Sequence, residues 1–173
     1  MTSTTLLERG RRTSTSSSWA HFGSSAKLIP RCGSEPDSGG HLGLCRLLSR
    51  PRGVKAAIQE ASAVFLNPIV LGELRSGFLK GATATQNAKQ LAEFLASPRC
   101  AVVVIDEDTA QRYAVIHDYL RRRGTPVAPN DLWIAASAAQ HALTVVTLDE
   151  DFNLIPQVLV QRFEPPSARS RTS

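Results

Sequence analysis

The sequence predicts an α/β protein built on a parallel sheet. Short, uninterrupted apolar runs of the kind found in buried strands occur at 63–66, 101–105 and 144–148. Between them lie longer segments in which apolar residues recur at helical spacing. Strands that alternate with helices of about ten residues or more form βαβ units, which give a parallel sheet with helices on both faces.

The first 50 residues have the composition of a disordered segment. They contain ten Ser, five Thr and six Gly, and no period of 2 or 3.6 persists among them. Such a segment cannot bury enough apolar surface to offset its chain entropy. We therefore expect residues 1–50 to be a disordered, non-native extension, residues 54–160 to form the domain, and residues 161–173 to be a C-terminal tail. The Arg- and Ser-rich composition also resembles an organellar transit peptide, although its amphipathicity is weak.

Charge and hydropathy exclude two broad classes of protein. The formal net charge of the 173 residues is +5. Residues 1–50 carry seven basic and three acidic side chains and the remainder thirteen and twelve, so the domain is nearly neutral and unlike a basic DNA-binding domain. No apolar run reaches the ~20 residues that span a bilayer. Three scattered cysteines are too few for a disulfide framework or a zinc site, so we expect a cytoplasmic protein without a membrane segment.

The first elements of the domain are marked by their end signals. A short amphipathic helix is expected from Val54, followed by the strand 63–66. Asn67 is a favoured N-cap residue, and the proline after it suits the first helical position, where a missing N–H costs nothing. These signals predict a helix over 68–80 that ends near Gly81.

The middle of the domain contains the clearest strand. A helix is expected over 85–96, ended by Pro98, and the β-branched run 101–105 follows it. Acidic residues at 106–108 then favour the N-terminal end of a long helix, whose dipole is positive there. Three arginines and Gly124 mark the C-terminal end of that helix.

The C-terminal part repeats the order of helix and strand. A helix over 132–142 is almost entirely apolar and is therefore expected to be buried. The strand 144–148 follows it, and 158–160 is expected to form an edge strand.

Carboxylates occur where α/β proteins place functional groups, beyond the C-terminal ends of strands and near helix N-termini. One lies a turn into a helix, one begins a helix, and a pair follows a strand. They are Glu73, Asp131, Asp149 and Asp151. Each position also has an ordinary explanation, respectively a solvated helix glutamate, a helix N-cap and a polar turn. Asn130 lies directly before Asp131 and argues against a role in helix capping alone, because one capping group would suffice.

These carboxylates would repel one another if they met at one edge of the sheet, so a cation is the simplest way to keep them ionised. Oxygen ligands without Cys or His suit Mg²⁺, with Mn²⁺ as an alternative. Such a metal activates water and offsets the charge of a phosphodiester displacement. The residues therefore predict metal-dependent hydrolysis of a phosphate ester. The sequence has neither a Gly-x-x-x-x-Gly-Lys phosphate loop nor a Gly-x-Ser-x-Gly nucleophile motif.

Three segments together resemble the PIN-domain ribonucleases of VapC toxin type. They are IVLGELRSG at 69–77, PNDLWIAA at 129–136 and VTLDEDFNLIP at 146–156. The resemblance covers about residues 54–160. It implies a three-layer α/β/α domain with a short parallel sheet, Mg²⁺-dependent RNA cleavage, a cognate antitoxin and, commonly, a homodimer.

The resemblance also assigns roles by position. The implied catalytic and metal-binding acids are Glu73, Asp131 and Asp149, three of a set of four, with Asp151 as an auxiliary metal ligand. Arg75 and Asn130 are the candidate substrate-binding residues.

The chain departs from the family at its start. The family opens with a strand that ends in Asp-Thr-Asn or Asp-Thr-Ser, whose aspartate is the fourth acid. Before Val54 the only aspartate is Asp37, in a context that is no strand. Permitted codons for residues 40–47 read Asp-Thr-Ser-Ala-Tyr-Val-Ala when shifted by one base. We therefore hypothesise that the residues before about Arg50 are frame-shifted or mis-started, and that the first strand is missing.

Three functions stay open at this stage. The family-level function is an active endoribonuclease toxin. The second is a catalytically inactive PIN remnant, impaired by loss of the first aspartate, that at most binds an antitoxin. The third is an α/β binding module without nuclease activity. Loss of a central strand would also expose sheet edges and favour aggregation.

Overall fold

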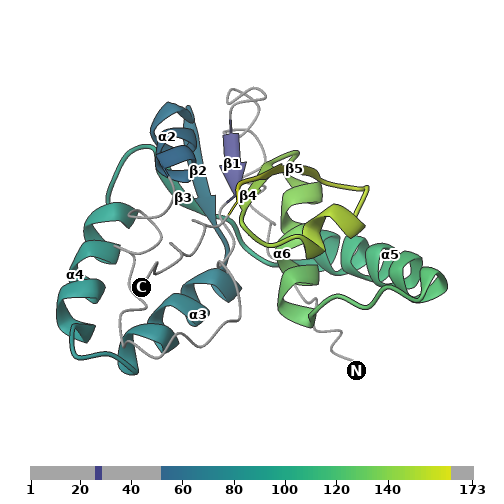
Figure 1. Cartoon of the computed structure of the whole chain (residues 1–173), viewed down its shortest axis with the longest axis horizontal. Coiled ribbons are helices and arrows are strands. Elements are labelled where there is room, and N and C mark those ends of the chain that lie inside the picture. Colours follow the sequence, from purple (N-terminus) through teal and green to yellow (C-terminus); the bar gives the residue numbers. More distant parts are fainter. Residues whose placement is uncertain (1–25, 29–51, 165–173) are drawn as a thin grey trace, which may run out of the picture.

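The protein folds around a five-stranded parallel sheet. The structure is a computed structural model and describes residues 26–28 and 52–164. The strand order is β3-β2-β1-β4-β5, and every neighbouring pair is parallel. Figure 1 shows α3 and α4 on one side of the molecule and α5 and α6 on the other, with the strands between them. The predicted α/β class and parallel sheet are confirmed.

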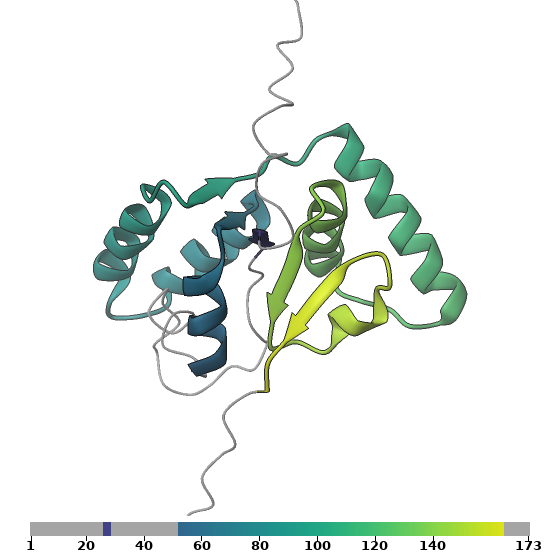
Figure 2. The same ribbon diagram turned by 90° about the horizontal axis from the view of Figure 1, so that it is seen from above.

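The strands are short, as the sequence predicts. They are β1 (Ala26–Leu28), β2 (Ala63–Leu66), β3 (Cys100–Val102), β4 (Thr144–Thr147) and β5 (Leu159–Arg162). The helices are α2 (Arg52–Glu60), α3 (Pro68–Leu79), α4 (Ala84–Leu95), α5 (Glu107–Arg123) and α6 (Pro129–Gln140), and the 3₁₀ helix η2 covers Asp151–Leu154. Figure 2 shows the same elements from above, with β4 and β5 side by side.

The central strand β1 corrects the prediction made for the first 50 residues. Lys27 is in register with Val64 of β2 and with Thr144 of β4, and Leu28 is fully buried. The predicted disorder and the predicted loss of the first strand are therefore wrong for Ala26–Leu28. A three-residue strand shows no periodicity in the sequence, because it is held by hydrogen bonds to neighbours on both sides rather than by an apolar pattern of its own. The rest of residues 1–50 lies outside the described residues.

The ends of two helices follow the expected signals. The side chain of Asn67 accepts a hydrogen bond from the Val70 N–H, and proline occupies the first turn of α3. Helix α5 begins with a capping box between Asp106 and Thr109. It ends at Gly124, whose φ of +66° is the left-handed conformation that glycine adopts without strain.

Other boundaries differ from the prediction. Helix α2 begins at Arg52, two residues before the predicted start of the domain, and α6 begins at Pro129 rather than at 132. Strand β3 ends at Val102. The Val103 N–H still donates to the Leu66 carbonyl oxygen of β2 at 2.8 Å, and the chain leaves the sheet after it, where Val104 is exposed. Strand β5 includes the first two residues of the predicted tail.

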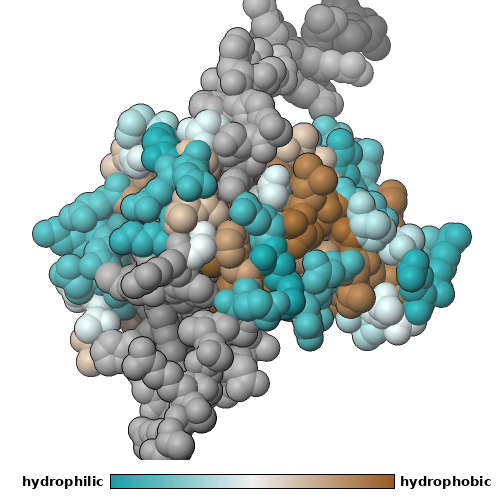
Figure 3. All heavy atoms as spheres, turned by 45° about the horizontal axis from the view of Figure 1, so that its top comes forward, coloured by the Kyte–Doolittle hydropathy of each residue, from teal (hydrophilic) through white to brown (hydrophobic). Residues whose placement is uncertain are grey.

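The core lies where the helices cover the sheet. Large apolar side chains with less than 2% exposure come from both layers, and they include Leu28, Leu66, Leu91, Ile116, Ile134 and Phe152. Figure 3 shows a patch of hydrophobic side chains on one face of the molecule. Exposed large hydrophobic side chains among the described residues include Leu159 of β5 and Val115 of α5. No helix among the described residues is long and apolar enough to cross a membrane.

Candidate active site

Glu73 and Asn130 are brought together from distant parts of the chain. Glu73 lies on α3 and is half-buried, and Asn130 lies in the first turn of α6. The Asn130 side chain donates a hydrogen bond from Nδ2 to Glu73 Oε1 at 2.7 Å. The structure therefore places the helix glutamate next to the Asn-Asp helix start, although 57 residues separate them. This contact speaks against a glutamate that is merely solvated.

A second, buried contact fixes the same two helices. Asn67, which is fully buried, donates a hydrogen bond from Nδ2 to Ser137 Oγ of α6 at 3.1 Å. Ser137 in turn donates to the Trp133 carbonyl oxygen at 2.8 Å. Because Asn67 also caps α3, one side chain holds both the start of α3 and the position of α6. Sequence reasoning found the cap but missed the contact with Ser137, since a serine in an apolar helix carries no signal of its partner.

Asp149 and Asp151 form a compact turn after β4. The Asp149 N–H donates to Thr147 Oγ1 at 2.9 Å, and Asp149 Oδ1 accepts a hydrogen bond from the Asp151 N–H at 3.0 Å. Asp151 begins η2, so the chain is not extended here, and the strand geometry that would put both side chains on one face does not apply. Burial, with repulsion from Asp149 and then Glu150, raises the pKa of the Asp151 carboxyl.

The remaining candidates differ in exposure. Asp131 is half-buried in the first turn of α6, where the helix dipole favours a carboxylate. Arg75 is exposed on α3, two residues from Glu73. The structure thus shows the pairs Glu73–Asn130 and Asp149–Asp151, while the convergence of all the acids stays a prediction.

The donor chemistry suits a hard cation, but the described residues do not complete a metal site on their own. Within the ranges 26–28 and 52–164, no three Asp, Glu, His or Cys side chains are grouped so that they could hold a metal ion. The four residues that follow β1 in the sequence, Ile29-Pro30-Arg31-Cys32, include no carboxylate. The position of the first strand is therefore filled, yet the sequence after it lacks the acid that the resemblance implies.

An aromatic cluster beside the site was not found from the sequence. The Tyr113 ring of α5 stacks on the Trp133 ring of α6 with centroids 4.4 Å apart. The His117 ring lies parallel to Tyr113 with centroids 6.0 Å apart. The i, i+4 spacing of Tyr113 and His117 could have suggested one helix face, but the partner on α6 could not be read from it.

Comparisons with known proteins agree with this fold. The PIN domain family matches residues 46–157. Ribonuclease VapC4 of Mycobacterium tuberculosis is 34% identical over 92 residues, which are 53% of this chain and 71% of VapC4. Ribonuclease VapC5 of the same species is 40% identical over 84 residues, which are 49% of this chain. The match covers 62% of VapC5, so the chain spans less than two thirds of that relative.

A solved structure shows the same arrangement of elements. The crystal structure of VapBC-5 from Mycobacterium tuberculosis, a member of the VapBC family of toxin–antitoxin systems, is similar with a TM-score of 0.57 at 29% identity. The similarity covers 80% of this chain and 99% of that one. The fold and the family match define a PIN domain. The chain belongs to the PIN-domain family, and within it is of VapC type.

Proposed function

We propose that this protein is a VapC-type toxin that cleaves RNA and is held in check by an antitoxin protein. Two relatives of VapC type are named ribonucleases, and the similar solved structure is a toxin–antitoxin assembly. The observation that carries the proposal is the contact between Glu73 and Asn130. This contact joins two of the three segments that resemble the family. Residues of one shared site must lie close together, whereas unrelated surface residues have no reason to do so.

The acids would act by holding Mg²⁺, or Mn²⁺ in its place. Mg²⁺ is commonly bound through one or two carboxylates together with waters and substrate phosphates, so it does not need a complete cage of protein ligands. The residues that would hold it are Glu73, Asp131 and Asp149, with Asp151 as an auxiliary ligand. When bound, the metal would activate a water molecule and offset the charge of the phosphodiester.

The neighbouring polar residues would position the reacting groups. Asn130 donates to Glu73 Oε1 and so leaves the second carboxylate oxygen, Oε2, to face the metal or its waters. Arg75 is exposed on the same helix and would meet an RNA phosphate away from Glu73 itself, because residues two apart on a helix do not face each other. Asp149 is held in its turn by the Asp151 N–H, which orients its carboxylate.

The second candidate is an impaired toxin that binds its antitoxin without cleaving RNA. It is favoured by the absence of a carboxylate in the four residues that directly follow β1. A frame shift before about Arg50 would explain that absence. Sequencing the locus tests this explanation: an intact single frame with no alternative start nearby would refute it.

RNA cleavage by the purified full chain tests the main proposal. We expect a single-stranded RNA to be cut in the presence of Mg²⁺, and not after chelation or in the Asp131→Asn variant. Glu93→Gln on α4 is the control, because it removes an exposed charge away from the site. Cleavage that survives in Asp131→Asn would contradict the proposed site.

Antitoxin binding and assembly separate the two candidates. A chain that forms a stable complex with a co-expressed VapB-type antitoxin but cuts no RNA is the impaired toxin. A chain that does both is the active one. We also propose a homodimer, which light scattering of the purified chain would test.

A further inference from the structure

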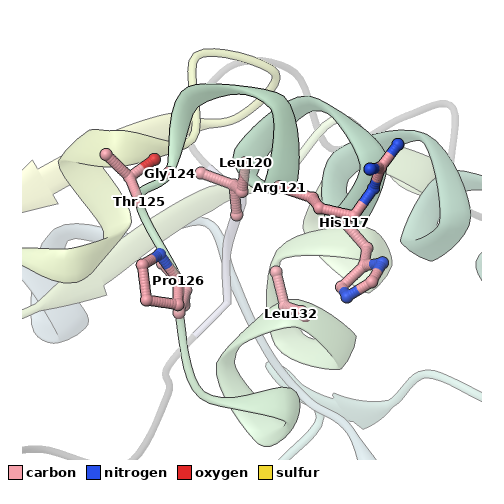
Figure 4. Close-up of a pocket in the computed structure, with 8 residues that line it drawn as sticks. His117, Leu120, Arg121, Gly124, Thr125, Pro126 and Leu132 are labelled. Atoms are coloured by element: carbon pink, nitrogen blue, oxygen red, sulfur yellow. The ribbon is translucent and has the colours of Figure 1, made fainter.

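A pocket lies between the C-terminal end of α5, the loop after it and α6. Its volume is about 280 Å³. The residues that line it are His117, Leu120, Arg121, Gly124, Thr125, Pro126, Val127 and Leu132. Figure 4 shows the rings of His117 and Pro126 on opposite sides of the pocket, with Leu120 and Leu132 between them. A volume at the small end of the range for ligand sites suits one ring system rather than a larger molecule.

The rim of the pocket is basic. His117 is exposed at the rim, and Arg121 lines it one helical turn further along α5. Asp118 pairs with Arg121 at 2.7 Å and with Arg122 at 2.8 Å, so one carboxylate is shared between two guanidinium groups. With Arg123 beside them, the end of α5 keeps an excess of positive charge. This charge favours a phosphate-bearing ligand over an uncharged one.

A row of rings joins this pocket to the candidate active site. Trp133 follows Asn130 by three residues on α6, and its ring stacks on the Tyr113 ring of α5. The His117 ring lies next along α5, parallel to Tyr113, and Arg121 follows one turn later. From Tyr113 to Arg121 the helix rises about 12 Å. Since stacked bases are spaced by about 3.4 Å, a few nucleotides would bridge this distance.

We propose that the pocket is a subsite for an unstacked base of single-stranded RNA. The base enters between His117 and Pro126, and its phosphate lies on Arg121. The neighbouring nucleotides run past Tyr113 and Trp133 toward Glu73 and Asn130. This inference rests on the proposed ribonuclease function, because it assigns the substrate strand of that same site.

Binding of a short, fluorescently labelled single-stranded RNA to the full chain tests the subsite. The measurement is fluorescence anisotropy in EDTA, so that no cleavage is needed. Base stacking on a ring commonly contributes enough for His117→Ala to weaken binding by about tenfold. Arg121→Ala should weaken it by a similar factor. Arg122→Ala removes the same charge one residue along without lining the pocket, and should weaken it by about twofold at most.

The variant Thr125→Val is the control for the shape of the pocket. Thr125 lines the pocket, and its Oγ1 is buried without a hydrogen-bond partner among the described residues. Valine has nearly the shape of threonine and removes this hydroxyl, so the melting temperature of the free chain should stay the same or rise, and RNA affinity should stay that of the wild type.

Several outcomes would overturn the inference. One is the absence of any RNA binding in EDTA, and another is wild-type affinity in both His117→Ala and Arg121→Ala. A third is unchanged RNA affinity with loss of a dimer in light scattering, which would assign the pocket to a second copy of the chain. Weakened RNA binding by the pocket variants of a chain that cuts no RNA would refute the nuclease proposal and support the subsite.

Discussion

Asn130 Nδ2 donates a 2.7 Å hydrogen bond to Glu73 Oε1, which joins α6 to α3 at the surface. The same helices are joined in the interior by the bond from Asn67 to Ser137. Two contacts, one exposed and one buried, therefore fix the relative position of the helices. The acid that follows Asn130 in the sequence is held at a constant place relative to Glu73 as a result.

The charge of Glu73, rather than its hydrogen bond, should matter for catalysis. Glu73→Gln keeps an acceptor oxygen for Asn130 but removes the negative charge. If the proposed function holds, RNA cleavage should fall by about 100-fold, as when one electrostatic group of an active site is lost. The melting temperature should change little, because glutamine keeps the hydrogen bond and the contact lies at the surface. Cleavage rates and thermal melts of Glu73→Gln and Glu93→Gln side by side measure this, and equal rates would remove Glu73 from the site.

The buried Asn67 should be important for stability. Asn67→Ala removes both the cap of α3 and the donor to Ser137. Loss of an N-cap costs about 1 kcal/mol and loss of a buried partner about as much again, so we expect a decrease of about 2 kcal/mol in the free energy of unfolding. Urea unfolding measures it. Asn67→Ser retains a capping oxygen and should lose less, whereas equal losses in the two variants would show that the cap contributes nothing.

Cys100 should be unreactive despite being a free thiol. Burial raises its pKa to about 11 from 9.0. At pH 8 the thiolate fraction, and with it the alkylation rate, should be about 100-fold lower than for an ordinary cysteine. Iodoacetamide labelling followed by peptide mapping tests this, with unfolded chain as the reference. Equal labelling of native and unfolded Cys100 would show that the thiol is not protected.

The sequence predicts those parts of the fold that carry their own local signal. The apolar run of β2, the cap at Asn67 and the glycine at 124 are such signals, and the structure has them all. Strand β1 has none, because its three residues are held by neighbours that lie far away in the sequence. The predicted β-branched strand at 101–105 is too long, since its last residues leave the sheet.

The candidate site shows the same limit. The motif spacing selects Glu73 and Asn130, and the structure brings these two together. The motif spacing does not reveal that the Asp149 carboxylate accepts a hydrogen bond from the Asp151 N–H within the same turn. Nor does the sequence reveal that Trp133 stacks on Tyr113, because a ring contact between two helices depends on their packing rather than on either pattern.

The cap of α5 should make stability depend on pH. The Thr109 backbone N–H donates to Asp106 Oδ1 at 3.0 Å, and Gln140 Nε2 donates to the same oxygen at 2.9 Å. The Thr109 backbone hydrogen bond first, and then the Gln140 and Thr109 side chains, lower the pKa of the Asp106 carboxyl. A lowered native pKa means that the ionised form is favoured by folding. Its contribution is therefore complete above the unfolded pKa of about 3.9 and is lost as the pH falls through the lower native value.

Asp106→Ala should accordingly destabilise the chain by about 1 kcal/mol at pH 7, the usual cost of an N-cap. The difference from the wild type should shrink near pH 3, where the carboxylate is becoming protonated. Urea unfolding of both chains at the two pH values measures it. Asp106→Asn is the matched control, because asparagine caps about as well as aspartate and does not titrate, so its small effect should be the same at both values. A loss in Asp106→Ala that is as large at pH 3 as at pH 7 would show that the charge of Asp106 plays no part in holding α5 to α6.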